Sequence, residues 1–374
     1  MRAEDPVRRT CSTLGLASLL LLVTLVTLRS CGADDEPQWR PSVVWDGDAY
    51  IATWSIYEGD STSAVFIQRI NETSSHRAVR PIFKGPSVRS GPDIAHSGQR
   101  AIVVFGQGDT PGDEDWHPRR HLVIVPLDRT GNVTGESQTT PWAVSPDTLC
   151  TAPAWTGRHF VVGYGEYSRH HRHRDKMGVI FITESGAYRG HILLRGRSSE
   201  CALAVQGEVL AVAAGRQASD ELGSPYNIDV QFIDTTTAGL LPDVVTIHSV
   251  NSGSPWSWVV LVPYNNAWAL LYMDADKTSR VALLDRNGII DTIALPVDVE
   301  PATAHLGVND RGLFVTWRRD GKVHLRGLEP GPAHTVRAPR SSEGTYAVGH
   351  ADECAAVWNS HHGKRIHLAR ARCQ

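Results

Sequence analysis

The sequence predicts an all-β protein built from seven copies of one short antiparallel unit. Three observations support this prediction: a repeat with a period near fifty residues, apolar columns that recur in every copy, and turn residues between the apolar runs. With 374 residues, 41% of them hydrophobic and 21% charged, the chain has the composition of an ordinary globular protein. Its formal net charge of -3 excludes a nucleic-acid-binding protein that depends on bulk positive charge.

One turn residue marks the same place in each copy of the repeat. These turn residues are Gly47, Gly98, Gly157, Gly207, Asn265, Asp310 and Ala351. Seven positions after them lie Trp54, Phe105, Tyr164, Ala214, Tyr272, Trp317 and Trp358, six of which are aromatic. The positions three before, three after and five after each turn residue are also small or apolar. Four columns that agree over seven copies, without a gap inside the unit, indicate a true repeat.

The turn residues separate two strands in each copy, because Gly and Asn accept the positive φ that a tight hairpin needs. The strand after the turn is apolar at nearly every position, as at residues 50–54, 101–105 and 313–317. A strand with one face in water would alternate between apolar and polar residues. We therefore expect these sheets to be covered on both faces.

A third strand follows in each unit, for example at residues 121–125, and several end in an Asp-x-x-Gly turn, as at 128–131. A weaker fourth strand comes next. Four antiparallel strands per unit, covered on both faces, predict a seven-bladed β-propeller. A propeller of six blades is the alternative, and tandem sandwich domains are the rival architecture. The blades are expected near residues 42–91, 92–148, 149–198, 199–252, 253–300, 301–343 and 344–374. The last of these has room for only three strands.

Residues 1–30 predict an export signal or a membrane anchor that precedes the fold. Arg8 and Arg9 are followed by an uncharged stretch at residues 10–28, which is the pattern of a signal peptide. Residues 28–31 resemble the lipobox of bacterial lipoproteins, in which Cys31 would be acylated, although Arg29 departs from that pattern. Secretion without a lipid, as a soluble periplasmic or extracellular protein, and a retained membrane span are the alternatives. In each case a short linker at 31–41 precedes one exported domain at 42–374.

The repeated unit has the form Ala/Val-x-x-Gly-x-x-ϕ-ϕ-Val-x-Trp, where ϕ is apolar, followed by a third strand and an Asp-x-x-Gly turn. This unit resembles those of exported bacterial β-propeller lipoproteins whose function is unassigned. The resemblance covers residues 42–374 and is architectural. It implies a propeller fold and attachment to the cell envelope, and it transfers no functional residue.

Four cysteines of the expected domain predict two disulfides, because an exported chain meets an oxidising compartment. Cys150 and Cys201 occupy nearly equivalent places in adjacent units, so we expect a bridge between those blades. Cys354 and Cys373 lie on neighbouring strands of the last unit, where a bridge would stabilise closure of the ring by ~3 kcal/mol. The alternative for Cys354 is a buried thiol, since it lies in an apolar column.

Long connections between the second and third strands of units two to four make one face the candidate binding face. The connection of unit two carries Asp109, Asp113, Asp115 and Trp116, and that of unit three carries Arg169, His170, His171 and His173. We expect the acidic connection to be solvated, with calcium as the alternative. Neighbouring arginines disfavour a metal at the histidines. The two connections have opposite charge and are expected to pair, which would make their contact depend on pH.

Catalytic motifs are missing: the chain has no Gly-x-Ser-x-Gly, His-Glu-x-x-His or Walker sequence. We therefore expect no catalytic residue, no metal and no other cofactor. The favoured hypothesis is a monomeric, non-enzymatic binding or scaffold protein of the cell envelope, with a protein or a glycan as partner. The alternative is a hydrolase or lyase that acts on a glycan at the central axis. A cluster of carboxylates with Arg or Tyr on that axis would favour the enzyme.

Overall fold

The chain divides into two compact units, Met1–Pro37 and Gln38–Gln374. The computed structural model describes residues of the second unit only. The described residues lie between 41 and 372, with gaps at 60–61, 71–78, 87, 109–119, 141–143, 150–152, 167–175, 198–200, 218–225, 249–258, 275, 297–298, 300–302, 329–332, 338–344 and 360–365. No helix within these residues is long and apolar enough to cross a membrane. The predicted export segment at 1–30 and Cys31 lie outside them.

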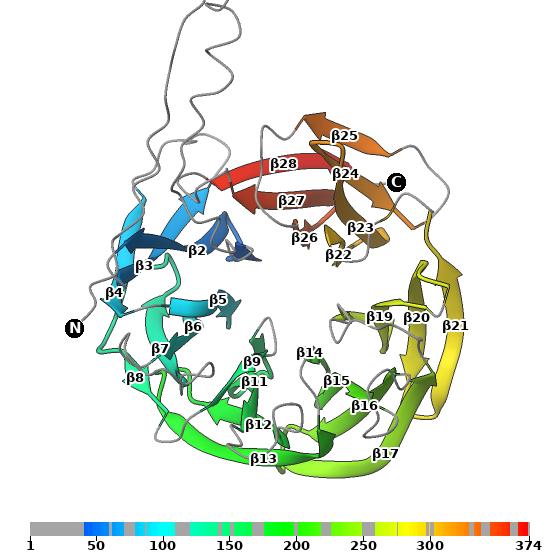
Figure 1. Ribbon diagram of the computed structural model, residues 1–374, viewed down its shortest axis with the longest axis horizontal. Coiled ribbons are helices and arrows are strands. Elements are labelled where there is room, and N and C mark those ends of the chain that lie inside the picture. The colour runs from blue at the N-terminus through cyan, green and yellow to red at the C-terminus, as the bar shows by residue number, and fades with distance from the viewer. Residues whose placement is uncertain are drawn as a thin grey trace, which may run out of the picture. The chain divides into compact units, whose positions relative to one another are not determined.

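The strands form seven antiparallel blades arranged in a ring, as the repeat predicts (Figure 1). Blade 1 contains β1 (Ser42–Trp45), β2 (Tyr50–Gly59), β3 (Thr62–Ile70) and β4 (Arg80–Pro86); blade 2 contains β5 (Val88–His96), β6 (Arg100–Gly108), β7 (Arg120–Asp128) and β8 (Gln138–Thr139). Blade 3 contains β10 (Ala154–Trp155), β11 (Phe160–Glu166), β12 (Lys176–Ile182) and β13 (Tyr188–Arg197); blade 4 contains β14 (Cys201–Gln206), β15 (Val209–Gln217), β16 (Tyr226–Asp234) and β17 (Gly239–His248).

The remaining blades follow the same order, with the first strand of each innermost in the ring. Blade 5 contains β18 (Val260–Tyr264), β19 (Ala267–Met273), β20 (Ser279–Asp285) and β21 (Gly288–Ala294); blade 6 contains β22 (His305–Asn309), β23 (Gly312–Arg319), β24 (Lys322–Gly327) and β25 (His334–Arg337). Blade 7 contains β26 (Tyr346–His350), β27 (Glu353–Asn359) and β28 (Ile366–Arg372). The expectation of a three-stranded last blade is confirmed.

An additional strand, β9 (Val144–Leu149), lies between blades 2 and 3. Val144 pairs with Arg120 of β7 and with Glu166 of β11, and Leu149 pairs with Tyr164. The two blades therefore share one nine-stranded sheet. The repeat does not predict this strand, because β9 lies outside the four-strand unit and is specified only by its neighbours.

The predicted turn residues occupy the hairpins between the first and second strands. Six of the seven have a positive φ, for example 97° at Gly47 and 47° at Asn265, and in blade 6 the positive φ is at Gly312, beside Asp310. The residue before the turn residue often caps the turn. Asp46 Oδ1 accepts the backbone N–H groups of Asp48 and Ala49 at 2.8 and 2.7 Å. Ser97, Thr156 and Asn309 accept equivalent N–H groups in blades 2, 3 and 6.

The core is divided among the contacts between neighbouring blades. All seven residues of the predicted aromatic column are at most 6% exposed, and Trp54 is fully buried. Seven hydrophobic clusters occur, each shared by two adjacent blades. In one of them, Ile51 of blade 1 packs with Val103 of blade 2. The sheets are therefore covered on both faces, which explains why their second strands do not alternate.

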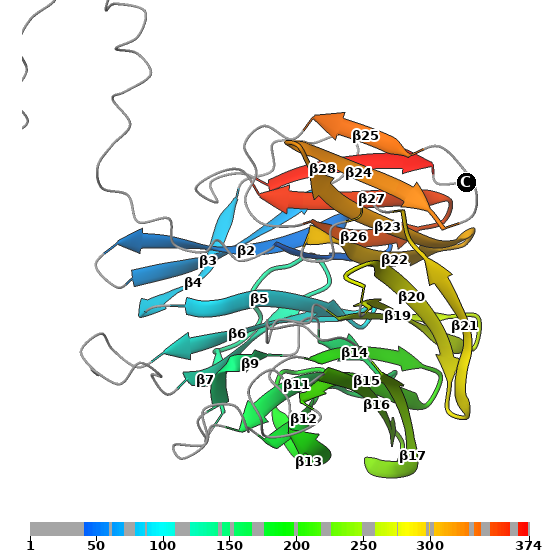
Figure 2. The ribbon, with the colours of Figure 1, turned by 45° about the vertical axis from the view of Figure 1, so that its right-hand side comes forward.

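The ring closes between blades 7 and 1, which lie side by side in both views (Figure 2). Tyr50 Oη donates a hydrogen bond to Glu353 Oε1 at 2.6 Å, and the rings of Trp45 and His350 lie 4.0 Å apart. Among the described residues, no strand from before β1 joins blade 7, whose outer strand β28 pairs only with β27. Side-chain packing between the first and last blades closes the described part of the ring.

The described cysteines, Cys201 and Cys354, are both buried. Cys201 begins β14, and Cys354 on β27 pairs with Ala371, two positions before Cys373. Their expected partners Cys150 and Cys373 lie outside the described residues, so the two disulfides stay predictions.

A buried ion pair supports the first hairpin. Arg69 Nε lies 2.7 Å from Asp46 Oδ2, whose side chain is fully buried. Burial opposes ionisation of Asp46, but hydrogen bonds from Arg69 and from the N–H groups of Ala49 and Asp48 outweigh it and lower the pKa of this carboxyl. Arg129 Nε of blade 2 also donates to the Asp46 carbonyl at 3.4 Å, so the hairpin contacts the neighbouring blade.

Replacing Asp46 by Asn should lower the free energy of unfolding by about 2 kcal/mol at pH 7, because charge-assisted hydrogen bonds are lost. The pKa of Asp46 is lower in the folded protein than its value of about 3.9 in the unfolded chain, so the ionised carboxylate stabilises the fold above that pH. This stabilisation is lost as the pH falls through the folded-state pKa of Asp46. The difference between wild type and Asp46→Asn should thus shrink as the pH is lowered from 5 toward 2. Urea denaturation at several pH values measures it.

The matched control is Asp48→Asn, since Asp48 also pairs with Arg69 but its side chain is 70% exposed. We expect that variant to lose less than about 0.5 kcal/mol. Equal losses in the two variants at pH 7 would contradict the role of the buried pair.

Candidate functional site

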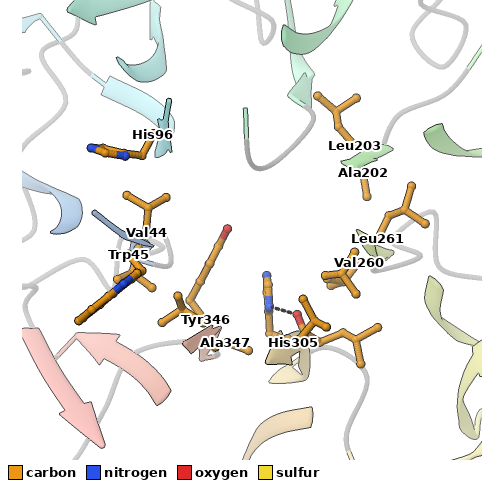
Figure 3. Close-up of a pocket in the computed structure, with 17 residues that line it drawn as sticks. Val44, Trp45, His96, Ala202, Leu203, Val260, Leu261, His305, Tyr346 and Ala347 are labelled. Carbon is orange, nitrogen blue, oxygen red and sulfur yellow. Dashed lines mark hydrogen bonds between the residues drawn. The ribbon is translucent and has the colours of Figure 1, made fainter. Parts of the chain in front are cut away.

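A pocket of about 340 Å³ lies on the axis of the ring, where the inner strands of six blades converge (Figure 3). Its described lining comes from β1, β5, β14, β18, β22 and β26. Most of the lining residues are Val, Leu, Ala and Gly, and four carry rings: Trp45, His96, His305 and Tyr346. We call this space the axial pocket.

The position five residues before each turn residue lies at an equivalent place on the inner strands, and two of its polar residues, His305 and Tyr346, line the axial pocket. The strand pairings place this position equivalently in each blade, for example Ser42 opposite Thr53, Asp93 opposite Val104 and Tyr346 opposite Val357. In blades 6, 7, 1 and 2 the residues are His305, Tyr346, Ser42 and Asp93, whereas blades 4 and 5 have Ala202 and Val260. We call the first four residues the polar arc. It spans four consecutive blades, and the two members that line the pocket, His305 and Tyr346, share it with aliphatic residues of blades 4 and 5.

The polar arc lies at the end of the inner strands that is far from the hairpin turns. The second strand of each blade begins at the turn and ends at the connection to the third strand. Ser42, His305 and Tyr346 are the first residues of β1, β22 and β26, whereas Asp93 lies inside β5 and pairs with Val104, the middle residue of β6. The polar arc is therefore on the same side of the ring as the long connections.

His305 and Tyr346 come from adjacent blades and pack against each other, with ring centroids 4.1 Å apart and planes inclined by 31°. Figure 3 shows both rings projecting into the pocket. His305 Nδ1 lies 2.9 Å from the carbonyl oxygen of Leu306, which can only accept a hydrogen bond. Nδ1 is therefore the donor in this contact.

The hydroxyl of Tyr346 is held in its protonated form. Burial raises its pKa well above the usual range, and the negative charge of Asp93 adds to this effect, while a hydrogen bond with the Ser42 hydroxyl opposes it. Ser42 is itself fully buried, and its Oγ accepts the N–H of Ile94 at 3.2 Å. The Tyr346 phenol is thus a neutral hydrogen-bonding group fixed between blades 7, 1 and 2.

His96 has a different role from His305. Its Nδ1 accepts the N–H of Gly98 at 2.9 Å, so the proton is on Nε2, which lies 3.4 Å from the Arg129 carbonyl. Burial lowers the pKa of His96. Figure 3 shows its ring turned away from His305 and Tyr346. His96 therefore supports the hairpin of blade 2 and does not join the polar arc.

The binding residues predicted from the sequence lie outside the described residues. This holds for Asp109, Asp113, Asp115 and Trp116 of blade 2 and for Arg169, His170, His171 and His173 of blade 3. Their pairing, and a calcium site among them, stay predictions. Among the described residues, no group of three or more His, Cys, Asp or Glu side chains could hold a metal ion.

The polar arc is not among the site residues that the sequence predicts. A signal was present, because the column five residues before the turn residue is polar in blades 1, 2, 6 and 7, while the next column is aliphatic in the same blades. Its meaning depends on knowing that the inner strands surround an axis.

Comparisons with known proteins support the fold. No family model matches the chain, and no curated protein matches it. Among solved structures, BBS1N in complex with ARL6DN is 12% identical, with a TM-score of 0.52 over 90% of this chain and 93% of that chain. The β-propeller domain of Myceliophteria thermophila Cps50 (Swd1) is 10% identical, with a TM-score of 0.49 over 89% of this chain and 96% of that chain. Likeness at these identities carries no function to this chain, and the propeller architecture rests on the strand order and pairing described above.

The state of Tyr346 can be measured by ultraviolet titration of its phenol. An ordinary Tyr ionises near pH 10, whereas the difference between wild type and Tyr346→Phe should show no phenolate signal below about pH 11. A difference signal with a midpoint near pH 10 would show that Tyr346 is neither desolvated nor influenced by Asp93.

Proposed function

We propose that the protein is an exported, lipid-anchored β-propeller that binds a protein or glycan partner of the cell envelope through the face with the long connections. The single observation that supports this most is that the strand ends joined by those connections lie on one side of the ring. Loops on such a scaffold commonly form binding surfaces, because they vary without disturbing the core.

Three consecutive blades contribute the longest connections between second and third strands. β6 ends at Gly108 and β7 begins at Arg120, whereas β23 of blade 6 ends at Arg319 and β24 begins at Lys322. The corresponding connections of blades 3 and 4 run from Glu166 to Lys176 and from Gln217 to Tyr226. Blades 2, 3 and 4 are neighbours in the ring, so the strand ends that these connections join lie at adjoining positions on the same face.

The axial pocket favours binding over glycan cleavage. Glycosidases commonly use a pair of carboxyl groups on either side of the scissile bond. None of the described residues that line the axial pocket is Asp, Glu, Lys or Arg, and Asp93 is the one carboxylate of the polar arc. This chemistry suits recognition of a ligand, and we keep the non-enzymatic hypothesis.

Lipid attachment is tested by replacing Cys31 with Ala. If Cys31 carries the lipid, the wild-type protein should separate into the detergent phase and the variant into the aqueous phase or remain as unprocessed precursor. Mass spectrometry of the N-terminal peptide identifies the acyl group. A wild-type N-terminus that lacks acylation would contradict lipid anchoring and leave plain secretion or a retained span.

Partner binding is tested by replacing residues 109–119 and 167–175 with the two-residue turn that connects β23 and β24 in blade 6. The matched control replaces residues 235–238, on the opposite face of blade 4, with the turn Arg286-Asn287 of blade 5. After cross-linking in the envelope, wild type and control should recover the same partner, and the first variant should recover at least tenfold less. Equal recovery by all three proteins, or no partner of the wild type, would refute the proposal.

A further inference from the structure

We propose that the axial pocket is a binding site for one small, uncharged molecule with an apolar, ring-containing body and a group that hydrogen-bonds to Tyr346. This site goes beyond the proposed function, because it is built from the inner strands and needs none of the long connections. A macromolecular partner and a small ligand could therefore be present independently.

The size of the pocket suits a small molecule. Its volume of about 340 Å³ is near the lower end of the range of roughly 300–1,000 Å³ found for sites that enclose small ligands. A water molecule occupies about 30 Å³ in the liquid, so the space is far larger than a single solvent site. The inner strands that surround it are parts of the packed blades, which makes the site largely preformed.

The wall opposite the polar arc selects an apolar body. Figure 3 shows Leu203, Val260 and Leu261 on one side of the pocket and Val44 on another. Val44 and Val260 are partly exposed, whereas Leu203 and Leu261 are almost fully buried. Covering the exposed parts of these side chains with an apolar ligand would release water from them, which is favourable.

Tyr346 and His305 determine where the polar group of the ligand lies. The centroids of the two rings lie 4.1 Å apart, and the rings offer aromatic faces and edges to a ring of the ligand. Aromatic rings pack against each other in offset or inclined arrangements. A hydroxyl group has one donor and two acceptor positions, so the contact of Tyr346 with Ser42 leaves capacity for a ligand atom. The ligand would therefore align its polar group with the polar arc.

The charges around the pocket exclude an ionised ligand. A charged group that leaves water needs a partner of opposite charge, and no described lining residue is Asp, Glu, Lys or Arg. Asp93, whose negative charge acts on Tyr346, repels anions in particular. An uncharged ligand avoids both costs.

Two fluorescent probes with the same ring skeleton test this charge preference. N-phenylnaphthylamine is neutral, whereas anilinonaphthalenesulfonate has the same rings and a sulfonate. The full chain should bind the neutral probe saturably, with one site per chain, and bind the sulfonated probe at least tenfold more weakly. Absence of saturable binding of the neutral probe, or equal affinity for both probes, would overturn the proposal.

Variants locate the binding site. Val260→Phe and Val44→Phe fill the pocket from two different blades, and each should weaken binding of the neutral probe at least tenfold. Tyr346→Phe keeps the shape of the pocket and should weaken binding about fivefold, as expected for one lost hydrogen bond. The matched control is Val336→Phe on β25, where Val336 is 37% exposed on the outside of the ring.

All variants share the same apolar N-terminal segment, so any probe bound there cancels in the comparison. Thermal unfolding verifies that each variant folds. If either Val260→Phe or Val44→Phe does not fold, the other variant is used to locate the site. If neither folds, the proposal is tested by Tyr346→Phe and by the comparison of the two probes. Unchanged affinity in a folded Val260→Phe or Val44→Phe variant would place the probe elsewhere and overturn the proposal.

Discussion

Packing between neighbouring blades is the constraint on which the rest of the structure depends. Each sheet is apolar on both faces and therefore needs another sheet on each side, which a linear array cannot provide for its two end blades. A ring satisfies this requirement, and the seven clusters divide the core among seven equivalent contacts. The contact between the chain's first and last blades, with Tyr50 and Glu353 joined at 2.6 Å, belongs to the same series.

Closure of the ring also creates the candidate site. The polar arc comes from blades 6, 7, 1 and 2, so it extends across the contact between the two ends of the folded domain. Ser42 begins β1 and Tyr346 begins β26, and their hydroxyl groups interact only because these blades meet. Opening this contact would separate Tyr346 from both Ser42 and Asp93. Ligand binding at the axis would accordingly stabilise the closed ring, since a ligand that binds only the closed state favours it.

The two faces of the ring differ in how strongly local sequence specifies them. On the hairpin side, a residue with positive φ occurs in the first turn of every blade, and in blades 1, 2, 3 and 6 a short polar residue caps that turn: Asp46, Ser97, Thr156 and Asn309. The opposite side has connections of unequal length and no repeated cap in the sequence. The repeated turns of the hairpin side support the fold. The side with the unequal connections is therefore available for recognition of a partner.

The sequence by itself determined the repeat, the hairpin turns and the buried aromatic column, because turn chemistry and strand periodicity are local properties that each unit carries in full. Trp54, Trp317 and Trp358 are buried where the repeat predicts. Only the tertiary structure decided how the ring closes, that β9 joins blades 2 and 3, and that Ser42 and Asp93 act on Tyr346, which lines the axial pocket with His305. These features depend on contacts between residues far apart in the chain, such as Tyr50 and Glu353, which are 303 positions apart, and no local pattern encodes which distant strands become neighbours.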